Sequence, residues 1–414
     1  MIKKVYVSVL VFMCFSVQVF SQNETKALFL GNSYTYYNQM PQMVFDIAES
    51  MGEELVTASN TPGGYTFEGH TTNLASLALI EEGNWDFVIL QEQSQIPSFP
   101  VAQVANESLP YAEALNDLIE TYNPCSETVF YMTWGRENGD AGNCEFWPPI
   151  CTYEGMDDLL AASYLTMADD NEAIVSPVGR VWRWIRENYP DLNLYASDGS
   201  HPSAEGSYAA AVSFYTVMFR DNPEEITFNS TISDSDADII KLAVKTVVFD
   251  QFSEWSVGGY DLTADFDLFI AEETGDVELI NTSYGAESYL WEINGNEYSS
   301  EDVFLMTDGQ EFFVSLTTIN ECDTAYVEGQ SVDFIDNISE KSPEDLLFYP
   351  NPVKTNVIFS KDVNRIIISD VKGKVCMDEV LTSRTVNVQR LNPGFYVMTC
   401  YTKEGEFEFH LIKE

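Results

Sequence analysis

Short apolar runs alternate with helical patterns of apolar residues between positions 26 and 256. The runs are continuous and lack helical spacing, which is typical of parallel strands buried on both faces. We expect strands at 27–30, 55–58, 87–90, 129–133 and 173–176, and helices at 40–51, 74–81, 109–122, 156–168, 181–188, 204–219 and 236–255. This alternation predicts an α/β domain, a flavodoxin-like parallel sheet flanked by helices.

The pattern changes after residue 256. From 260 to 334 helical spacing disappears, and short alternating strands are separated by turn signals such as Asn294-Gly295-Asn296. The polar stretch 337–345 reads as a linker, and 346–414 again shows only strand patterns. We therefore expect the α/β domain at 22–256, followed by two small all-β sandwich domains at 257–336 and 346–414.

Residues 1–21 have the pattern of a secretory signal peptide, in which Lys3 and Lys4 precede an apolar stretch at 5–20. The chain carries 20 basic and 66 acidic side chains, and loss of the two signal lysines takes its net charge from −46 to −48. Such a surface repels nucleic acid and anionic membranes, so we expect neither as a partner. It suits a soluble extracellular protein.

Six cysteines remain once Cys14 leaves with the signal peptide. An exported protein can keep disulfide bonds, and Cys144 with Cys151 is the first choice of pair because the two close a short loop. Metal spacing of the Cys-x-x-Cys kind is absent from the sequence, so we do not expect zinc.

The first candidate for chemistry is Ser33. The apolar run 26–30 ends at Gly31 and Asn32, which tolerate a sharp turn, and the helix expected at 40–51 follows. Ser33 therefore lies at the carboxyl end of a strand, where open α/β sheets bind their ligands. A serine in this place can equally be a turn or capping residue.

Only three histidines are available to activate a serine: His70, His201 and His410. His201 follows Asp198 by three residues in a polar loop, and a carboxylate so placed can accept a hydrogen bond from the imidazole. The alternative is a loop whose Asp and His only cap the next helix. His410 lies in the last β domain, which leaves His201 as the expected base.

Four segments together resemble the blocks of the SGNH (GDSL-type) hydrolases over about residues 24–256. They are Gly31-Asn32-Ser33, Gly63-Gly64, the polar stretch near residue 91 and Asp198-x-x-His201. The resemblance implies a serine esterase that works through an acyl-enzyme, with Ser33 as nucleophile, His201 as base and Asp198 orienting the imidazole. It implies no metal and no organic cofactor.

The third block departs from the family pattern. Members usually have Gly-x-Asn there, with the Asn amide completing the oxyanion hole, whereas this chain reads Leu90-Gln91-Glu92-Gln93-Ser94-Gln95. A glutamine amide can donate the same hydrogen bond. The resemblance therefore implies an oxyanion hole made by the backbone N–H groups of Ser33 and Gly64 and the side chain of Gln93, with Gln91 as the alternative.

The expected substrate is a short acyl ester, first of all an O-acetyl ester on a carbohydrate. Aromatic residues near the expected site suit sugar rings, and we expect substrate contacts from Tyr34 and Trp147. His70, beside the glycine pair, is a further candidate contact, although such a histidine can also be a surface or capping residue. The alternatives are a lipase or phospholipase, or an inactive surface adhesin that binds glycans.

The downstream segments carry two further resemblances. Asn281-Thr282-Ser283 and the stretch 288–295 resemble a PKD-type, immunoglobulin-like domain, in which Trp291 is a core residue. Phe348-Tyr349-Pro350-Asn351-Pro352 and the end of the chain resemble the C-terminal sorting domain of type IX secretion substrates from Bacteroidota. This implies export through the periplasm to the cell surface or medium, with the type IX machinery as partner. The apolar stretch at 5–20 is short and no positively charged stop follows it, so we expect no transmembrane anchor in the mature chain.

Overall fold

The computed structural model describes residues 24–270, 277–305, 312–327, 331–332, 348–349, 351, 353–370, 374–381, 383–403 and 406–413. The expected signal peptide at 1–21 and linker at 337–345 lie outside the described residues. The chain divides into two compact units, the first formed by Met1–Asp308 with Phe312–Ser331 and the second by Gly309–Glu311 with Val332–Glu414.

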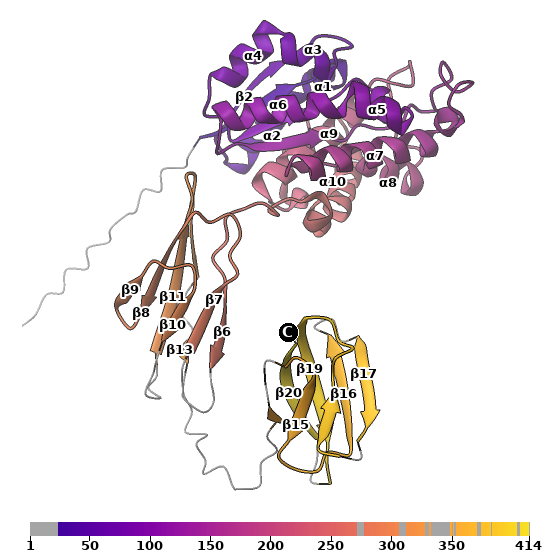
Figure 1. Cartoon of the computed structure of the whole chain (residues 1–414). Helices are drawn as coiled ribbons and strands as arrows, with labels where there is room; N and C mark the ends of the chain where they lie inside the picture. The colour runs from indigo at the N-terminus through magenta and orange to yellow at the C-terminus, as the bar shows by residue number, and fades with distance from the viewer. Residues whose placement is uncertain are drawn as a thin grey trace, which may run out of the picture. The chain divides into compact units, whose positions relative to one another are not determined.

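A parallel five-stranded sheet with the order β2-β1-β3-β4-β5 organises the first unit (Figure 1). Its strands are β1 (Thr25–Leu30), β2 (Leu55–Asn60), β3 (Phe87–Leu90), β4 (Glu127–Tyr131) and β5 (Ile174–Ser176). The strand order reverses at β1, because the chain runs from β1 out to β2 and then returns to β3 on the other side. The carboxyl end of β1 therefore opens into the crevice where such sheets bind ligands.

Helices pack on the sheet in two groups. In one group α9 packs against α2, α8 and α10, and in the other α6 packs against α3, α4, α5 and α7. The helices are α1 (Ser33–Tyr36), α2 (Met40–Met51), α3 (Phe67–Thr72), α4 (Leu74–Glu81), α5 (Val101–Glu107), α6 (Leu109–Tyr122), α7 (Tyr153–Asp170), α8 (Val178–Asn188), α9 (Ala204–Phe219) and α10 (Asp234–Val247). The central strand residues Ala27, Leu28 and Phe29 are fully buried, as expected for a sheet covered on both faces. The expected α/β fold class is confirmed.

One expected helix is shorter than predicted. The pattern at 236–255 predicts a single helix, but α10 ends at Val247 and a separate 3₁₀ helix, η5 (Phe249–Trp255), follows with non-helical backbone at Gln251. Trp255 folds back so that its Nε1 donates to the carbonyl of Val247 at 2.6 Å. This bond satisfies one of the carbonyls that the end of α10 leaves without an intrahelical partner.

Two antiparallel sheets follow in the first unit. One has the order β10-β7-β6 and the other β12-β11-β8-β9, with β13 also paired to β11. Their strands are β6 (Phe266–Ile270), β7 (Val277–Asn281), β8 (Ser288–Ile293), β9 (Asn296–Tyr298), β10 (Val303–Leu305), β11 (Phe312–Ile319), β12 (Thr324–Val327) and β13 (Ser331–Val332). Trp291 is fully buried and its Nε1 donates to the carbonyl of Ser300, which confirms it as a core residue.

The second unit is also all-β. Its sheets have the orders β14-β15-β18 and β17-β16-β19-β20. The strands are β14 (Phe348–Tyr349), β15 (Asn356–Phe359), β16 (Arg365–Asp370), β17 (Val375–Val380), β18 (Thr385–Asn387), β19 (Gly394–Tyr401) and β20 (Glu406–Lys413). The buried residues Val357, Ile366 and Met398 form part of a hydrophobic core separate from that of the first unit. His410 lies on β20 opposite Val397, so it belongs to this unit.

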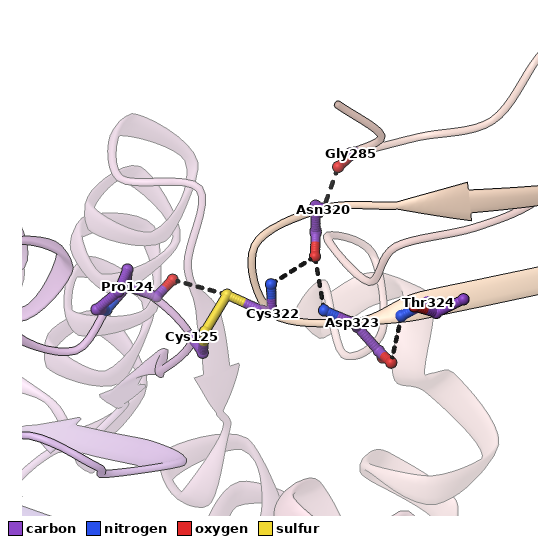
Figure 2. The surroundings of a disulfide bond; sticks show 7 residues. All are labelled: Pro124, Cys125, Gly285, Asn320, Cys322, Asp323 and Thr324. Atoms are coloured by element: carbon purple, nitrogen blue, oxygen red, sulfur yellow. Dashed lines mark hydrogen bonds between the residues drawn. A yellow bond between two sulfur atoms is a disulfide. The ribbon is translucent and has the colours of Figure 1, made fainter. Parts of the chain in front are cut away.

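Two disulfide bonds lie in the first unit. Cys144–Cys151 confirms the expected pair, whereas Cys125–Cys322 joins residues 197 positions apart and was not predicted. Figure 2 shows the second bond, which ties the turn between β11 and β12 to the loop before β4. Asn320 shapes this turn, since its Oδ1 accepts the N–H groups of Cys322 and Asp323.

This second disulfide fixes where the β region attaches to the α/β domain. Cys125 precedes β4, so the attachment lies at the amino ends of the parallel strands, opposite the edge that holds Ser33.

In the part of the chain that the structure describes, no helix is both long and apolar enough to cross a membrane.

Candidate active site

Ser33, His201 and Asp198 form a continuous hydrogen-bonded chain at the carboxyl end of β1. The Nε2 atom of His201 lies 2.8 Å from Oγ of Ser33, and its Nδ1 lies 2.6 Å from Oδ2 of Asp198. A carboxylate only accepts hydrogen bonds, so Nδ1 carries a ring proton, and in the neutral ring Nε2 presents its lone pair to the serine hydroxyl. The structure thus brings together the three residues expected from the sequence.

The Asp198 carboxylate is held in its ionised form. Its Oδ1 accepts the backbone N–H groups of Ser200 at 3.0 Å and His201 at 2.9 Å. Partial burial opposes ionisation, but the hydrogen bonds from His201 and from these two N–H groups outweigh it, and the pKa of Asp198 is lowered from its ordinary value. The carboxylate therefore orients the imidazole and favours a positive charge on it.

The turn that carries Ser33 requires its glycine. A Cβ atom added at Gly31 would lie 2.5 Å from Oγ1 of Thr35 and 2.8 Å from Oε1 of Gln91. The next residue, Asn32, caps α1: its side chain accepts the N–H of Tyr34 at 3.1 Å and donates to the carbonyl of Tyr65 at 2.9 Å. Ser33 thus begins α1, where backbone N–H groups have no intrahelical acceptor.

The loop that carries Asp198 and His201 is held from behind by aromatic residues. Trp134 donates through Nε1 to the carbonyl of Ser200 at 3.1 Å, and the hydroxyl of Tyr34 lies 2.7 Å from Oγ of Ser200. The rings of Tyr34 and Trp134 stack with centroids 4.7 Å apart. Tyr34 is only 3% exposed, so its expected substrate contact is wrong: the ring supports the loop beneath the site.

Tyr37 and Tyr36, rather than Tyr34, lie at the open side of the site. The Tyr37 ring stacks on the imidazole of His201 with centroids 4.5 Å apart and an interplanar angle of 21°. The Tyr36 side chain is 46% exposed, and its hydroxyl is 3.8 Å from where a Cβ of Gly63 would lie. Tyr36 follows Ser33 by three residues in α1, so the two residues lie on the same side of this helix.

His70 is a buried structural residue, and the substrate contact expected of it is wrong. Its Nε2 lies 2.9 Å from the carbonyl of Gly31, and its Nδ1 lies 2.7 Å from Oγ of Ser76. A carbonyl only accepts, so Nε2 carries the proton and the Ser76 hydroxyl donates to Nδ1. Burial lowers the pKa of His70 to about 4, against the opposing effect of the Gly31 bond, so the ring is neutral. It fixes the turn that precedes the nucleophile.

The two candidate glutamines of the third block, Gln91 and Gln93, both make hydrogen bonds within the fold. Gln91 is fully buried, and its Oε1 accepts the backbone N–H of Asn32 and the hydroxyl of Thr35, both at 2.9 Å. Its amide nitrogen donates to the carbonyl of Glu92. Gln91 therefore clamps the nucleophile turn, which corrects its expected role as the alternative oxyanion donor.

Gln93 folds over its own loop. Its Oε1 accepts the backbone N–H groups of Gln95 at 2.8 Å and Ile96 at 3.3 Å. Its Nε2 makes one long contact, 3.3 Å to Oε1 of Gln95, and an amide nitrogen has two hydrogens to donate. Gly64 has φ +68° and nothing within 4 Å of where its Cβ would lie, which leaves open space beside its backbone. The oxyanion roles of Gln93 and Gly64 stay predictions.

Glu92 connects the second and third blocks, and sequence reasoning missed it. This fully buried carboxyl accepts the N–H of Phe67 at 3.0 Å, the N–H of Gln93 at 2.6 Å and the hydroxyl of Ser108 at 2.8 Å. Burial, opposed by these three hydrogen bonds, raises the pKa of Glu92 to about 7. Since Phe67 begins α3, just after the glycine pair, Glu92 ties together the two loops expected to supply oxyanion donors.

The loop closed by Cys144 and Cys151 is joined to the third block. Trp147 donates through Nε1 to the carbonyl of Ser98 at 3.1 Å, while Gln95 donates to the buried carboxylate of Asp140 at 2.6 Å. Trp147 is half-buried, so its indole nitrogen serves the fold and its expected substrate contact stays a prediction. Among the described residues, no group of three His, Cys, Asp or Glu side chains is arranged to hold a metal ion.

Comparison with known protein families identifies the end of the chain. Residues 347–414 match a family model described as "Secretion system C-terminal sorting domain". This confirms the resemblance to type IX secretion substrates, and such a tail implies interaction with the secretion machinery and export to the cell surface or the medium. No curated protein matches the chain.

Several solved structures are similar to this chain. A DUF4886 family protein from Bacteroides uniformis ATCC 8492 is 16% identical over 55% of this chain and 95% of its own, with a TM-score of 0.49. A protein from Slackia heliotrinireducens assigned to the SGNH hydrolases is 27% identical over 47% and 98%, with a TM-score of 0.39. The psychrotrophic esterase EstA from Pseudoalteromonas sp. is 15% identical over 48% and 98%, with a TM-score of 0.35. Solved structures similar to this chain thus include SGNH hydrolases and esterases.

Proposed function

We propose that this protein is an exported serine esterase that hydrolyses short acyl esters, first of all O-acetyl groups on carbohydrates. The observation that carries the proposal is the hydrogen-bonded chain from Ser33 through His201 to Asp198, with 2.8 Å and 2.6 Å between the linked atoms. A hydroxyl, a neutral imidazole and an ionised carboxylate in this order are what nucleophilic acyl transfer needs.

The reaction begins when Nε2 of His201 takes the proton of Ser33 and Oγ attacks the ester carbonyl carbon. Asp198 remains ionised and stabilises the imidazolium. The oxyanion of the tetrahedral intermediate is met by the backbone N–H groups of Ser33 and Gly64 and the side-chain amide of Gln93. Removal of one such donor typically lowers the rate about 10²–10³-fold.

The intermediate then collapses to an acyl-enzyme. His201 gives its proton to the departing alcohol oxygen as the C–O bond breaks, which leaves the acyl group on Ser33 and a neutral imidazole. A water molecule gives its proton to the same Nε2 and attacks the acyl carbon. Collapse of the second intermediate releases the carboxylic acid and returns the proton to Ser33.

Two features support a carbohydrate ester as the substrate. Tyr36 and Tyr37 place aromatic rings beside the nucleophile, one 46% exposed and the other stacked on His201, and aromatic faces suit sugar rings. The excess of 66 acidic over 20 basic side chains disfavours polyanionic substrates and anionic lipid surfaces.

A panel of p-nitrophenyl esters of rising acyl length, followed by acetylated xylan, tests the proposal. We expect turnover to be highest with acetate and to fall as the acyl chain grows, with acetate released from the polymer. Ser33→Ala is the matched control and should remain folded but inactive. Highest turnover on long acyl chains would favour the lipase alternative, and absence of turnover on every ester would refute esterase activity.

A further inference from the structure

The outer face of the sheet β12-β11-β8-β9 presents two large aromatic side chains to solvent. On β11, Val314 and Leu316 are fully buried, whereas Phe313 is 62% exposed, as the alternation of a strand requires. Tyr326 on β12 is 60% exposed and lies opposite Thr317 on β11. Thr317 is four residues from Phe313, so both residues lie on the same face of the strand. The two rings therefore belong to one face. Isolated exposed aromatics are common, but two on one face mark a binding surface when they line a common depression.

Such a depression is present between them. A groove of about 480 Å³ is lined by Phe313 and Tyr326, with Ser315 and Glu292 also lining it. Ser315 and Glu292 are directly paired across β11 and β8. Asn294 also lines the groove: its Oδ1 accepts the backbone N–H of Phe313 at 2.9 Å, which leaves its amide hydrogens to donate. The groove thus combines two aromatic walls with a hydroxyl, a carboxylate and an amide.

The charge of this region limits what can occupy the groove. The segment 257–336 contains no lysine, arginine or histidine and many acidic residues. Nucleic acids, sulfated or uronic-acid polymers and anionic lipids are therefore repelled. The volume of the groove lies within the range of about 300–1,000 Å³ that is typical of pockets for small ligands.

We propose that this groove binds a short segment of a neutral polysaccharide. The apolar faces of one or two sugar rings would pack on Phe313 and Tyr326, while their hydroxyl groups hydrogen-bond with Ser315, Glu292 and Asn294. Aromatic walls with a few convergent polar groups are the composition expected of a site that recognises a ring with both apolar faces and hydroxyls.

The groove is separate from the site at Ser33. Phe313 is the second residue of β11, and Cys322, which is bonded to the α/β domain, follows the other end of that strand. The seven residues from Phe313 to Ile319 span about 20 Å of extended strand, so the Phe313 end of the groove lies away from the attachment point. Its role is to retain the polymer, and the proposal does not depend on the proposed esterase activity.

Affinity electrophoresis of the full chain tests this proposal in a Ser33→Ala background, so that turnover cannot alter the polymer. The gels contain hydroxyethyl cellulose, xylan, glucomannan or laminarin, with alginate as the polyanionic control. We expect at least one neutral polymer to retard the protein and alginate not to. Phe313→Ala and Tyr326→Ala should each weaken binding by about 5- to 10-fold, the loss of one aromatic packing contact.

Phe304→Ala is the matched control, because Phe304 is 70% exposed but lies on β10, in the other sheet. It should bind like the parent chain, and thermal unfolding should show that all three variants are folded. The proposal is overturned if no neutral polymer retards the parent, if alginate retards it equally, or if Phe304→Ala has the same effect as Phe313→Ala. Self-association that both groove variants abolish in sedimentation would overturn it in favour of a second copy of the chain.

Discussion

Two substitutions at His70 distinguish the effects of the two hydrogen bonds that this buried ring makes. Glutamine can place its amide nitrogen near the position of Nε2 and keep the donor to the Gly31 carbonyl, whereas asparagine reaches only the position of Nδ1, toward Ser76. Since Gly31 lies two residues before Ser33, loss of its bond frees the nucleophile turn. We expect His70→Asn to lower kcat by about 10- to 100-fold with KM little changed, and His70→Gln to retain most of the activity.

The same residue should contribute to stability in a pH-dependent way. Burial lowers the pKa of His70 from 6.5 to about 4, so the unfolded chain binds the proton first as pH falls. The stability that neutral His70 contributes is complete above about pH 6.5 and is lost as pH falls toward 4. A shift of this size corresponds to about 3 kcal/mol.

The measurement compares the wild type with His70→Gln, which cannot titrate. Urea unfolding followed by tryptophan fluorescence at pH 7, 5.5 and 4 gives the difference in unfolding free energy, in which the titrations common to both chains cancel. The advantage of the wild type should shrink by about 3 kcal/mol between pH 7 and 4. A difference that does not change with pH, or equal kcat values for the Asn and Gln variants, would refute the reasoning.

Three further predictions concern neighbouring features. In Glu92→Gln, the amide oxygen can accept the N–H groups of Phe67 and Gln93 as the carboxylate does. Because burial raises the pKa of Glu92 to about 7, the unfolding free energy of the variant should rise by about 3 kcal/mol relative to the wild type between pH 4.5 and 7. A difference in urea unfolding that stays constant with pH would contradict this. Gln93→Ala should lower kcat by roughly 10²-fold with little change in KM, and steady-state kinetics with unchanged kcat would remove Gln93 from the oxyanion hole. The double variant Cys125→Ser/Cys322→Ser should lose about 3–5 kcal/mol of stability in denaturant unfolding but keep ester turnover, because the bond lies at the sheet edge opposite Ser33; loss of turnover would show that the attached β region supports the site.

The sheet was readable from the sequence because its strands are continuous apolar runs. All five expected strands are present, and helices such as α2 (Met40–Met51) and α6 (Leu109–Tyr122) have the predicted ends. The short helices α1 (Ser33–Tyr36) and α3 (Phe67–Thr72) were missed because one or two turns give too little periodicity to detect. Their ends are set by capping contacts rather than by apolar patterns.

The candidate site could be predicted from the sequence only in part, because the sequence does not show which polar side chains are buried. The spacing of Asp198 and His201 predicts that the two side chains meet on one loop. No such spacing links Ser33 to a base, and His201 was assigned to it because the chain has only three histidines. Sequence does not show that His70 lies inside the protein. It likewise cannot show Cys125–Cys322, whose partners are 197 residues apart and are brought together only by the packing of two folded regions.

Labelling with a fluorophosphonate tests the central claim most directly, because the reagent forms a covalent bond only with an activated nucleophile. Intact mass and peptide mapping should show one phosphonyl group per chain, attached to Ser33, with loss of ester turnover in proportion to labelling. Ser33→Ala should take up no label, and His201→Ala should be labelled far more slowly, since the base 2.8 Å from Oγ is gone. A label on another residue, or full ester turnover by Ser33→Ala, would contradict the account.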